Sequence, residues 1–170
     1  MQIAVTVDDL AFVAADAVAR PVNAELRAAT PVIRRLELAA GDGLLRQLQL
    51  HEPLVVGAAV VTGAGAVQAG LMIHAVVSTP TEAVTRDGVR RATASALQRA
   101  HDFAVRDLAI APFGLGAGNL DVDDAAHTMV AALRSHAEHR RHPDVVNIVV
   151  ENDLEADAFR AAVARAERAA

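Results

Sequence analysis

The stretch Ala111-Pro112-Phe113-Gly114-Leu115-Gly116-Ala117-Gly118-Asn119-Leu120 decides the fold, because it joins a predicted strand to a predicted helix through alternate glycines. Before it, the short apolar run 107–111 is typical of a buried strand, and after it apolar residues three and four apart predict a helix over 121–136. Glycines let backbone N–H groups converge, and a helix start leaves its first N–H groups unpaired. The stretch is therefore either an anion cradle, most often for phosphate, or a tight turn that needs glycine for its shape.

Strands and helices alternate along the rest of the chain. Apolar runs predict strands at residues 2–6, 55–56, 58–62, 71–77, 107–111 and 145–150. Apolar residues at helical spacing predict helices at residues 31–40, 44–50, 85–103, 121–136 and 154–166. Thr30 and Pro31 suit the N-cap and the first turn of the first of these helices. The alternation predicts an α/β fold with a largely central sheet between helices.

A further apolar run, Ala17 to Ala19, is followed directly by Arg20 and Pro21. Proline has no N–H group for a sheet hydrogen bond. We therefore expect that this run does not continue as a central strand.

The composition limits the classes of function. With 170 residues, 53% of them hydrophobic and 22% charged, the chain can form one compact domain with a substantial core. The formal net charge of −5 disfavours binding along a nucleic-acid backbone, although a small anion could still be held by backbone amides. The absence of cysteine excludes disulfides and thiolate metal sites. No signal peptide or membrane-length apolar run is seen, so we expect a cytoplasmic location without membrane contact.

Two other patterns have simpler explanations than a cofactor or a metal. The glycines of 63–65 follow a strand but lead into another strand rather than a helix, which favours a hairpin turn over a dinucleotide loop. His136, His139 and His142 lie three residues apart and could contribute to a metal site, but cations near a helix C-terminus are favourable without a ligand. We expect neither a metal nor a cofactor. His74 lies mid-strand, and we expect it to be packed in the core.

The acidic residues divide into two groups. Those at 121–124 begin a predicted helix, where carboxylates stabilise the helix dipole, so capping is their expected role. Asp8 and Asp9 follow the first strand with no clear helix after them, so they remain candidates for a polar contact with a ligand. The serines lack the context of a nucleophile elbow, so a serine hydrolase is not supported.

The order and ungapped spacing of several segments resemble the macro domain family, whose members bind ADP-ribose in an α/β fold. The segments that carry the resemblance are Asp8-Asp9-Leu10, Asp16 to Asn23, Ala39-Ala40-Gly41, Gly57 to Gly63, Leu71 to Val76 and Gly114 to Leu120. The resemblance runs over most of the chain. It implies one macro-type domain over 1–170, a three-layer α/β/α sandwich with a central mixed sheet.

The sequence also departs from the family pattern. Residues 28–31, Ala-Ala-Thr-Pro, stand where the family has a glycine run that wraps the diphosphate. Ile33 occupies the position of an acidic catalytic residue of many hydrolytic members, and Arg20 replaces the first Asn of a conserved family motif. Glu151 stands where an aromatic residue commonly stacks. These departures imply little or no hydrolytic activity, so we expect a binding protein rather than an enzyme and assign no catalytic residue.

The resemblance implies that the chain binds ADP-ribose or a related nucleotide diphosphate in a cleft at the strand ends, and an ADP-ribosylated protein is a further expected partner. The implied ligand-binding residues are Asp9, Leu10, Asn23, Val32, Ile33, Gly114, Leu115, Gly116, Ala117, Gly118 and Asn119. Asp9 would contact the adenine amino group, Asn23 would face the distal ribose, and the 114–119 loop would hold the diphosphate. Two alternatives stay open: a weak ADP-ribosyl hydrolase that uses Asn23 and water, and a macro fold with a closed cleft that serves protein contacts.

Overall fold

The structure is a computed structural model, and it describes residues 1–49, 51–116 and 120–169. Over these residues the strands are β1 (Gln2–Val7), β2 (Ala15–Asn23), β3 (Ala59–Gly63), β4 (Ala69–Ser78), β5 (Asp107–Ile110) and β6 (Val145–Val150). The helices are α1 (Pro31–Ala40), α2 (Asp42–Leu48), α3 (Arg86–Asp102), α4 (Val122–His139) and α5 (Asp153–Arg168). No helix in this part of the chain is long and apolar enough to cross a membrane.

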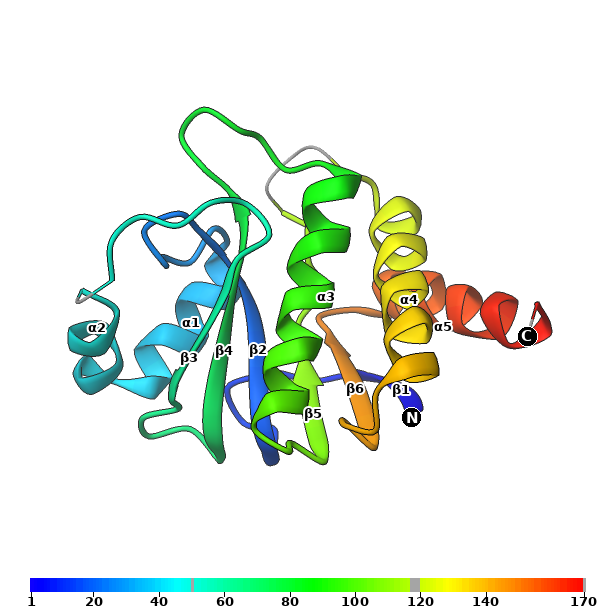
Figure 1. Cartoon of the computed structure of the whole chain (residues 1–170), viewed down its shortest axis with the longest axis horizontal. Helices are drawn as coiled ribbons and strands as arrows, with labels where there is room; N and C mark the ends of the chain where they lie inside the picture. The colour runs from blue at the N-terminus through cyan, green and yellow to red at the C-terminus, as the bar shows by residue number, and fades with distance from the viewer. Residues whose placement is uncertain (50, 117–119, 170) are drawn as a thin grey trace.

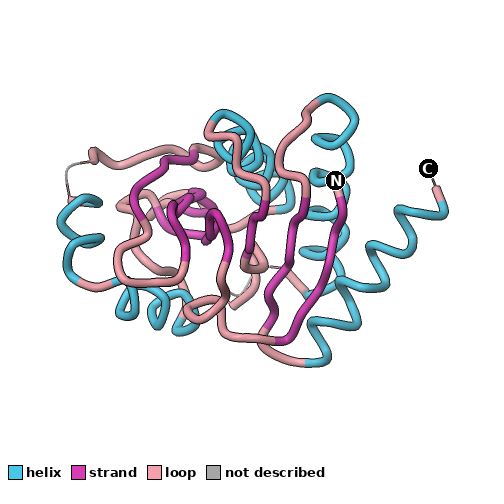
Figure 2. Tube along the Cα trace, turned by 90° about the horizontal axis from the view of Figure 1, so that it is seen from below, coloured by secondary structure: helices cyan, strands magenta, loops and turns pink. Residues whose placement is uncertain are grey.

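The strands form one mixed sheet in the order β1-β6-β5-β2-β4-β3 (Figure 1). All neighbouring pairs are parallel except β3 and β4, which are antiparallel, so the 63–65 glycines belong to a hairpin connection as predicted. The strands lie between helices on two sides, which confirms the expected three-layer α/β/α arrangement (Figure 2). One apolar core packs α3, α4 and α5 on one face, and a second core packs α1 and α2 on the other.

The expectation that Pro21 prevents a central strand is wrong. β2 runs from Ala15 through Asn23 between β5 and β4. The Ala111 N–H donates to the Ala19 carbonyl at 3.0 Å, so Ala19 faces β5, and Pro21 two residues later faces the same side. There β5 has already ended at Ile110, so no sheet hydrogen bond is lost at the proline, while β4 continues beside β2 through Asn23.

Most other element predictions are confirmed, with two differences. Residues 55 and 56 lie before β3 in loop and turn, not in a strand. α4 continues to His139, one turn beyond its predicted end. His74 is fully buried in β4, as expected.

The parallel strands β1, β2, β5 and β6 all end at the same edge of the sheet. The segments that leave them are residues 8–14, 24–30, 111–121 and 151–152. In open α/β sheets this edge is where ligands bind. The glycine-rich stretch, the start of α1 and the start of α5 are therefore brought together here.

Candidate functional site

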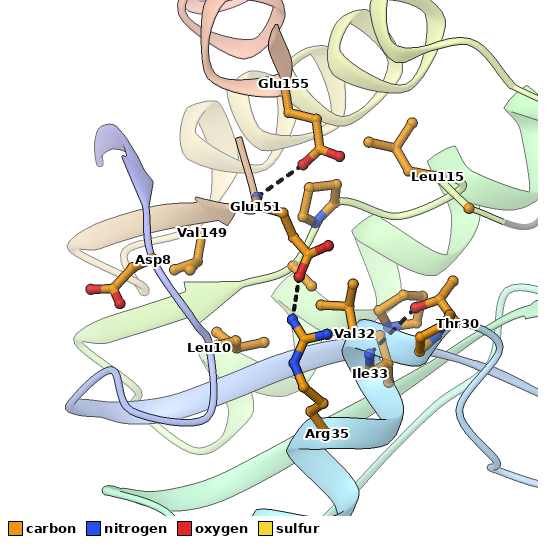
Figure 3. A pocket seen from close by; sticks show the side chains of 15 residues that line it. Asp8, Leu10, Thr30, Val32, Ile33, Arg35, Leu115, Val149, Glu151 and Glu155 are labelled. Carbon is orange, nitrogen blue, oxygen red and sulfur yellow. Dashed lines mark hydrogen bonds and ion pairs between the residues drawn. The ribbon is translucent and has the colours of Figure 1, made fainter. Parts of the chain in front are cut away.

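A cavity of about 290 Å³ opens at the carboxyl ends of these parallel strands (Figure 3). Its walls come from four separate segments of the chain. They consist of Asp8, Leu10, Pro21, Thr30, Pro31, Val32, Ile33, Arg35, Ala111, Pro112, Leu115, Gly116, Val149, Glu151 and Glu155. The volume is near the lower end of the range for small-molecule sites. The walls are mostly apolar, and the charged side chains among them are those of Asp8, Arg35, Glu151 and Glu155.

The start of α1 forms one wall of the cavity. Thr30 is the N-cap, and its hydroxyl accepts the Ile33 N–H at 3.3 Å. Pro31 has no N–H to offer, and the first turn contains no acidic residue. Among the described residues, none accepts the Val32 N–H. This helix start therefore presents an unpaired N–H and the positive end of the helix dipole to the cavity.

The glycine-rich stretch forms the facing wall. Gly116 has φ +75°, and a Cβ there would lie 2.9 Å from the Thr30 methyl, so the two loops touch at this point. Gly114 has φ +88°, but a Cβ there would meet Val89 at 2.8 Å and Leu120 at 3.0 Å. Gly116 therefore lies against the start of α1, whereas Gly114 packs against α3.

Three carboxylates and one guanidinium line the cavity. The carboxylates belong to Asp8, Glu151 and Glu155, and Arg35 of α1 reaches Glu151 (Figure 3). Arg35 pairs through Nη2 with Glu151 and through Nε with Asp9 at 3.6 Å. The Glu151 carboxylate raises the pKa of the Arg35 guanidinium. The Glu155 carboxylate accepts the Glu151 N–H at 3.0 Å.

The structure places some of the implied ligand-binding residues at the cavity and others elsewhere. Those that line it are Leu10, Val32, Ile33, Leu115 and Gly116. Those not among the lining residues are Asp9, Asn23 and Gly114. Ala117, Gly118 and Asn119 lie outside the described residues.

Asn23 and Asp9 each have local hydrogen bonds. The Asn23 Oδ1 accepts the N–H groups of Glu25 and Arg27, at 3.1 and 3.0 Å, in the turn after β2. The Asp9 Oδ1 accepts the Ala11 N–H at 3.0 Å, and its other oxygen pairs with Arg35. Asp9 therefore reaches the cavity through Arg35.

Sequence reasoning missed Arg35 and Glu155, and it kept Asp8 as a candidate for a polar contact without assigning it to the site. A signal for Arg35 existed: it lies three residues after Val32, on the same face of a predicted helix. Glu155 follows Glu151 by four residues, but the direction of its side chain depends on where α5 begins. Asp8 and Asp9 are adjacent, and successive side chains of an extended chain point to opposite sides. The sequence alone does not show which of the two lines the cavity; the structure places Asp8 there.

A buried polar network supports α1 behind the cavity. The fully buried Arg20 donates from Nη1 to Glu37 at 2.6 Å and from Nε to His74 Nδ1 at 2.8 Å. His74 Nδ1 must therefore lack a proton, so Nε2 carries it toward the Thr62 hydroxyl at 2.8 Å. Burial, and next the charge of Arg20, lower the pKa of His74 well below its ordinary value. Neither Arg20 nor His74 lines the cavity, so this network is structural.

The histidines near the end of α4 make local contacts. His136 Nε2 lies 2.8 Å from the His142 carbonyl, and His139 Nδ1 lies 3.0 Å from the Ser135 carbonyl. Within the described residues, no group of three or more histidine, aspartate or glutamate side chains is placed to hold a metal ion.

Comparison with known proteins gives matches in sequence and in structure. A family model described as "Macro domain" matches residues 19–129. An uncharacterized protein of Mycobacterium tuberculosis is 34% identical over 154 residues, which are 89% of this chain and 42% of that protein. An uncharacterized protein of Aquifex aeolicus is 30% identical over 135 residues, which are 79% of this chain and 82% of that protein. The chain thus spans less than half the length of its mycobacterial relatives.

Two solved structures share the fold at low sequence identity. The Oceanobacillus iheyensis macrodomain with ADP has a TM-score of 0.89 and 14% identity, over 98% of this chain and 92% of that chain. The Trypanosoma brucei macrodomain in complex with ADP has a TM-score of 0.85 and 19% identity, over 95% of this chain and 69% of that chain.

Proposed function

Because the chain belongs to the macro domain family, we propose that its cavity binds ADP-ribose or a related nucleotide diphosphate. The observation that carries this proposal is the pairing of the α1 start with Gly116 across the cavity. The start of α1 suits an anion because of its unpaired Val32 N–H and its helix dipole. Gly116 suits an anion because it has no side chain that would keep a ligand from its backbone. The diphosphate lies beside the point where they meet, against the Val32 N–H and the backbone of Gly116.

The rest of the cavity suits the remainder of such a ligand. Leu10, Val149 and Pro112 provide apolar walls. A site with mostly apolar walls and a few oriented polar groups is typical of small-molecule recognition. The Oceanobacillus iheyensis and Trypanosoma brucei macrodomains, both solved with ADP, have the same fold, which adds support for this class of ligand.

We do not assign hydrolysis to this cavity. Ile33 stands in the first turn of α1 and carries no ionisable group, and the Asn23 oxygen is engaged in its own turn. Activation of water needs a group that takes a proton or stabilises the departing group. Binding without turnover is the function that this arrangement supports best.

Isothermal titration calorimetry with ADP-ribose tests the proposal. We expect saturable binding of one ligand per chain. A chain that gives no binding heat, and no rise in melting temperature at millimolar ADP-ribose, would instead support the alternative in which contact between Thr30 and Gly116 closes the cleft and the fold serves protein contacts.

A further inference from the structure

The surroundings of the Arg35 guanidinium are a poor place for a phosphate group. Asp8, Glu151 and Glu155 line the cavity with carboxylates, and Arg35, the cation among the described lining residues, is already paired with Glu151 and Asp9. The start of α1 has an unpaired N–H and the positive end of the helix dipole instead. An anionic ligand with a neutral part is therefore oriented with its phosphates at the start of α1 and its neutral part beside Arg35.

The neutral end of a nucleotide is a flat base, which proteins commonly hold by stacking. Among the described residues that line the cavity there is no phenylalanine, tyrosine, tryptophan or histidine. The chain has no tryptophan or tyrosine, and its four phenylalanines are at 12, 103, 113 and 159. The guanidinium of Arg35 is thus the planar cationic surface that the described part of the cavity offers to a base.

The geometry of Arg35 suits this role. Its side chain is 51% exposed, so a ligand can reach it. Glu151 pairs with Nη2 (Figure 3), and Asp9 lies 3.6 Å from Nε. Carboxylates that follow two different strands therefore hold the guanidinium. A guanidinium fixed by carboxylates is ordered before the base arrives, and arginine stacks on planar rings through its delocalised face.

We infer that Arg35, held by Glu151 and Asp9, is the platform on which the base of the bound nucleotide stacks. This inference rests on the proposed function and adds a residue that contacts the base. It also gives Glu151 a role, because this glutamate orients the Arg35 guanidinium that stacks on the base.

Two substitutions separate stacking from charge. Arg35→Lys keeps the charge and loses the plane, whereas Arg35→Phe keeps a flat surface and loses the charge. If Arg35 stacks on the base, Arg35→Lys weakens ADP binding by about five- to 150-fold. Arg35→Phe then stays close to the wild-type affinity. Arg46→Lys, on the exposed face of α2, is the matched control and should bind as the wild type does.

Calorimetric titration of ADP into these four proteins, with melting temperatures measured alongside, gives distinct outcomes. Loss in Arg35→Lys with retention in Arg35→Phe supports the inference. Wild-type affinity in Arg35→Lys, or equal loss in both Arg35 variants, overturns it and leaves the proposed function intact. A wild-type protein that binds neither ADP nor ADP-ribose overturns the proposed function, and the inference with it.

Discussion

Val32→Asp places a negative charge where the proposed diphosphate lies. Val32 is the second residue of α1 and lines the cavity. At about 5 Å, a carboxylate and a single phosphate charge repel by between about 0.8 kcal/mol at a dielectric constant of 80 and about 3 kcal/mol at 20. Binding of ADP-ribose should therefore weaken by about fourfold to 160-fold.

The same substitution should leave the fold intact, which makes the result interpretable. An acidic residue in the first turn of a helix stabilises the helix by about 0.3–1 kcal/mol, which offsets part of the lost contact of a half-buried valine. The melting temperature should therefore change little.

The matched control is Val55→Asp, which makes the same chemical change at a side chain that is 73% exposed and does not line the cavity. Calorimetric titrations at low and high salt should show weak binding only for Val32→Asp, with a smaller difference at high salt. The reasoning is refuted if both variants bind as tightly as the wild type, or if they lose affinity equally.

Three further predictions concern stability and turnover. Gly116→Ala should lower the free energy of unfolding by about 1 kcal/mol or more, because it adds a Cβ at positive φ against the Thr30 methyl. Gly43→Ala in α2 should raise the free energy of unfolding. Equal effects of the two substitutions in urea unfolding would contradict this prediction. Since the pKa of His74 is lowered by folding, the unfolded chain binds more protons below pH 6.5. The contribution of His74 to the free energy of unfolding should thus be fully present above pH 6.5 and fall by about 1.4 kcal/mol per pH unit below it, until the pKa of His74 in the folded chain is reached. If His74→Gln does not reduce this slope, His74 is not its cause. We expect no turnover of a mono-ADP-ribosylated protein in a release assay, because the first turn of α1 carries no carboxylate; release as fast as that of an active hydrolase would show an unrecognised base.

The local sequence was a good guide where local chemistry decides the structure. The N-cap at Thr30 and Pro31 at the first helical position are both observed. The α/β class and the central sheet both followed from the alternation of apolar patterns along the chain. These features depend on neighbours in the chain, so one sequence is enough to predict them.

Features that depend on distant segments could not be predicted. Pro21 is compatible with a central strand only because β5 ends beside it. The sequence around Pro21 carries no information on where β5 ends. Arg35 became part of the site because Asp9 and Glu151 meet it from the ends of two other strands. Asn23, expected at the distal ribose, is engaged by the N–H groups of the turn that follows it.

The most direct test of the proposed nucleotide site is a two-dimensional amide NMR spectrum of the chain, recorded with and without ADP-ribose. We expect the largest shifts at Val32 and Gly116, which line the proposed diphosphate site, and smaller shifts at Leu10 and Arg35. Shifts confined to other surfaces, such as the groove between α3 and α4 beside Ala94 and Ser135, would contradict it. A spectrum unchanged at saturating ADP-ribose would contradict it as well.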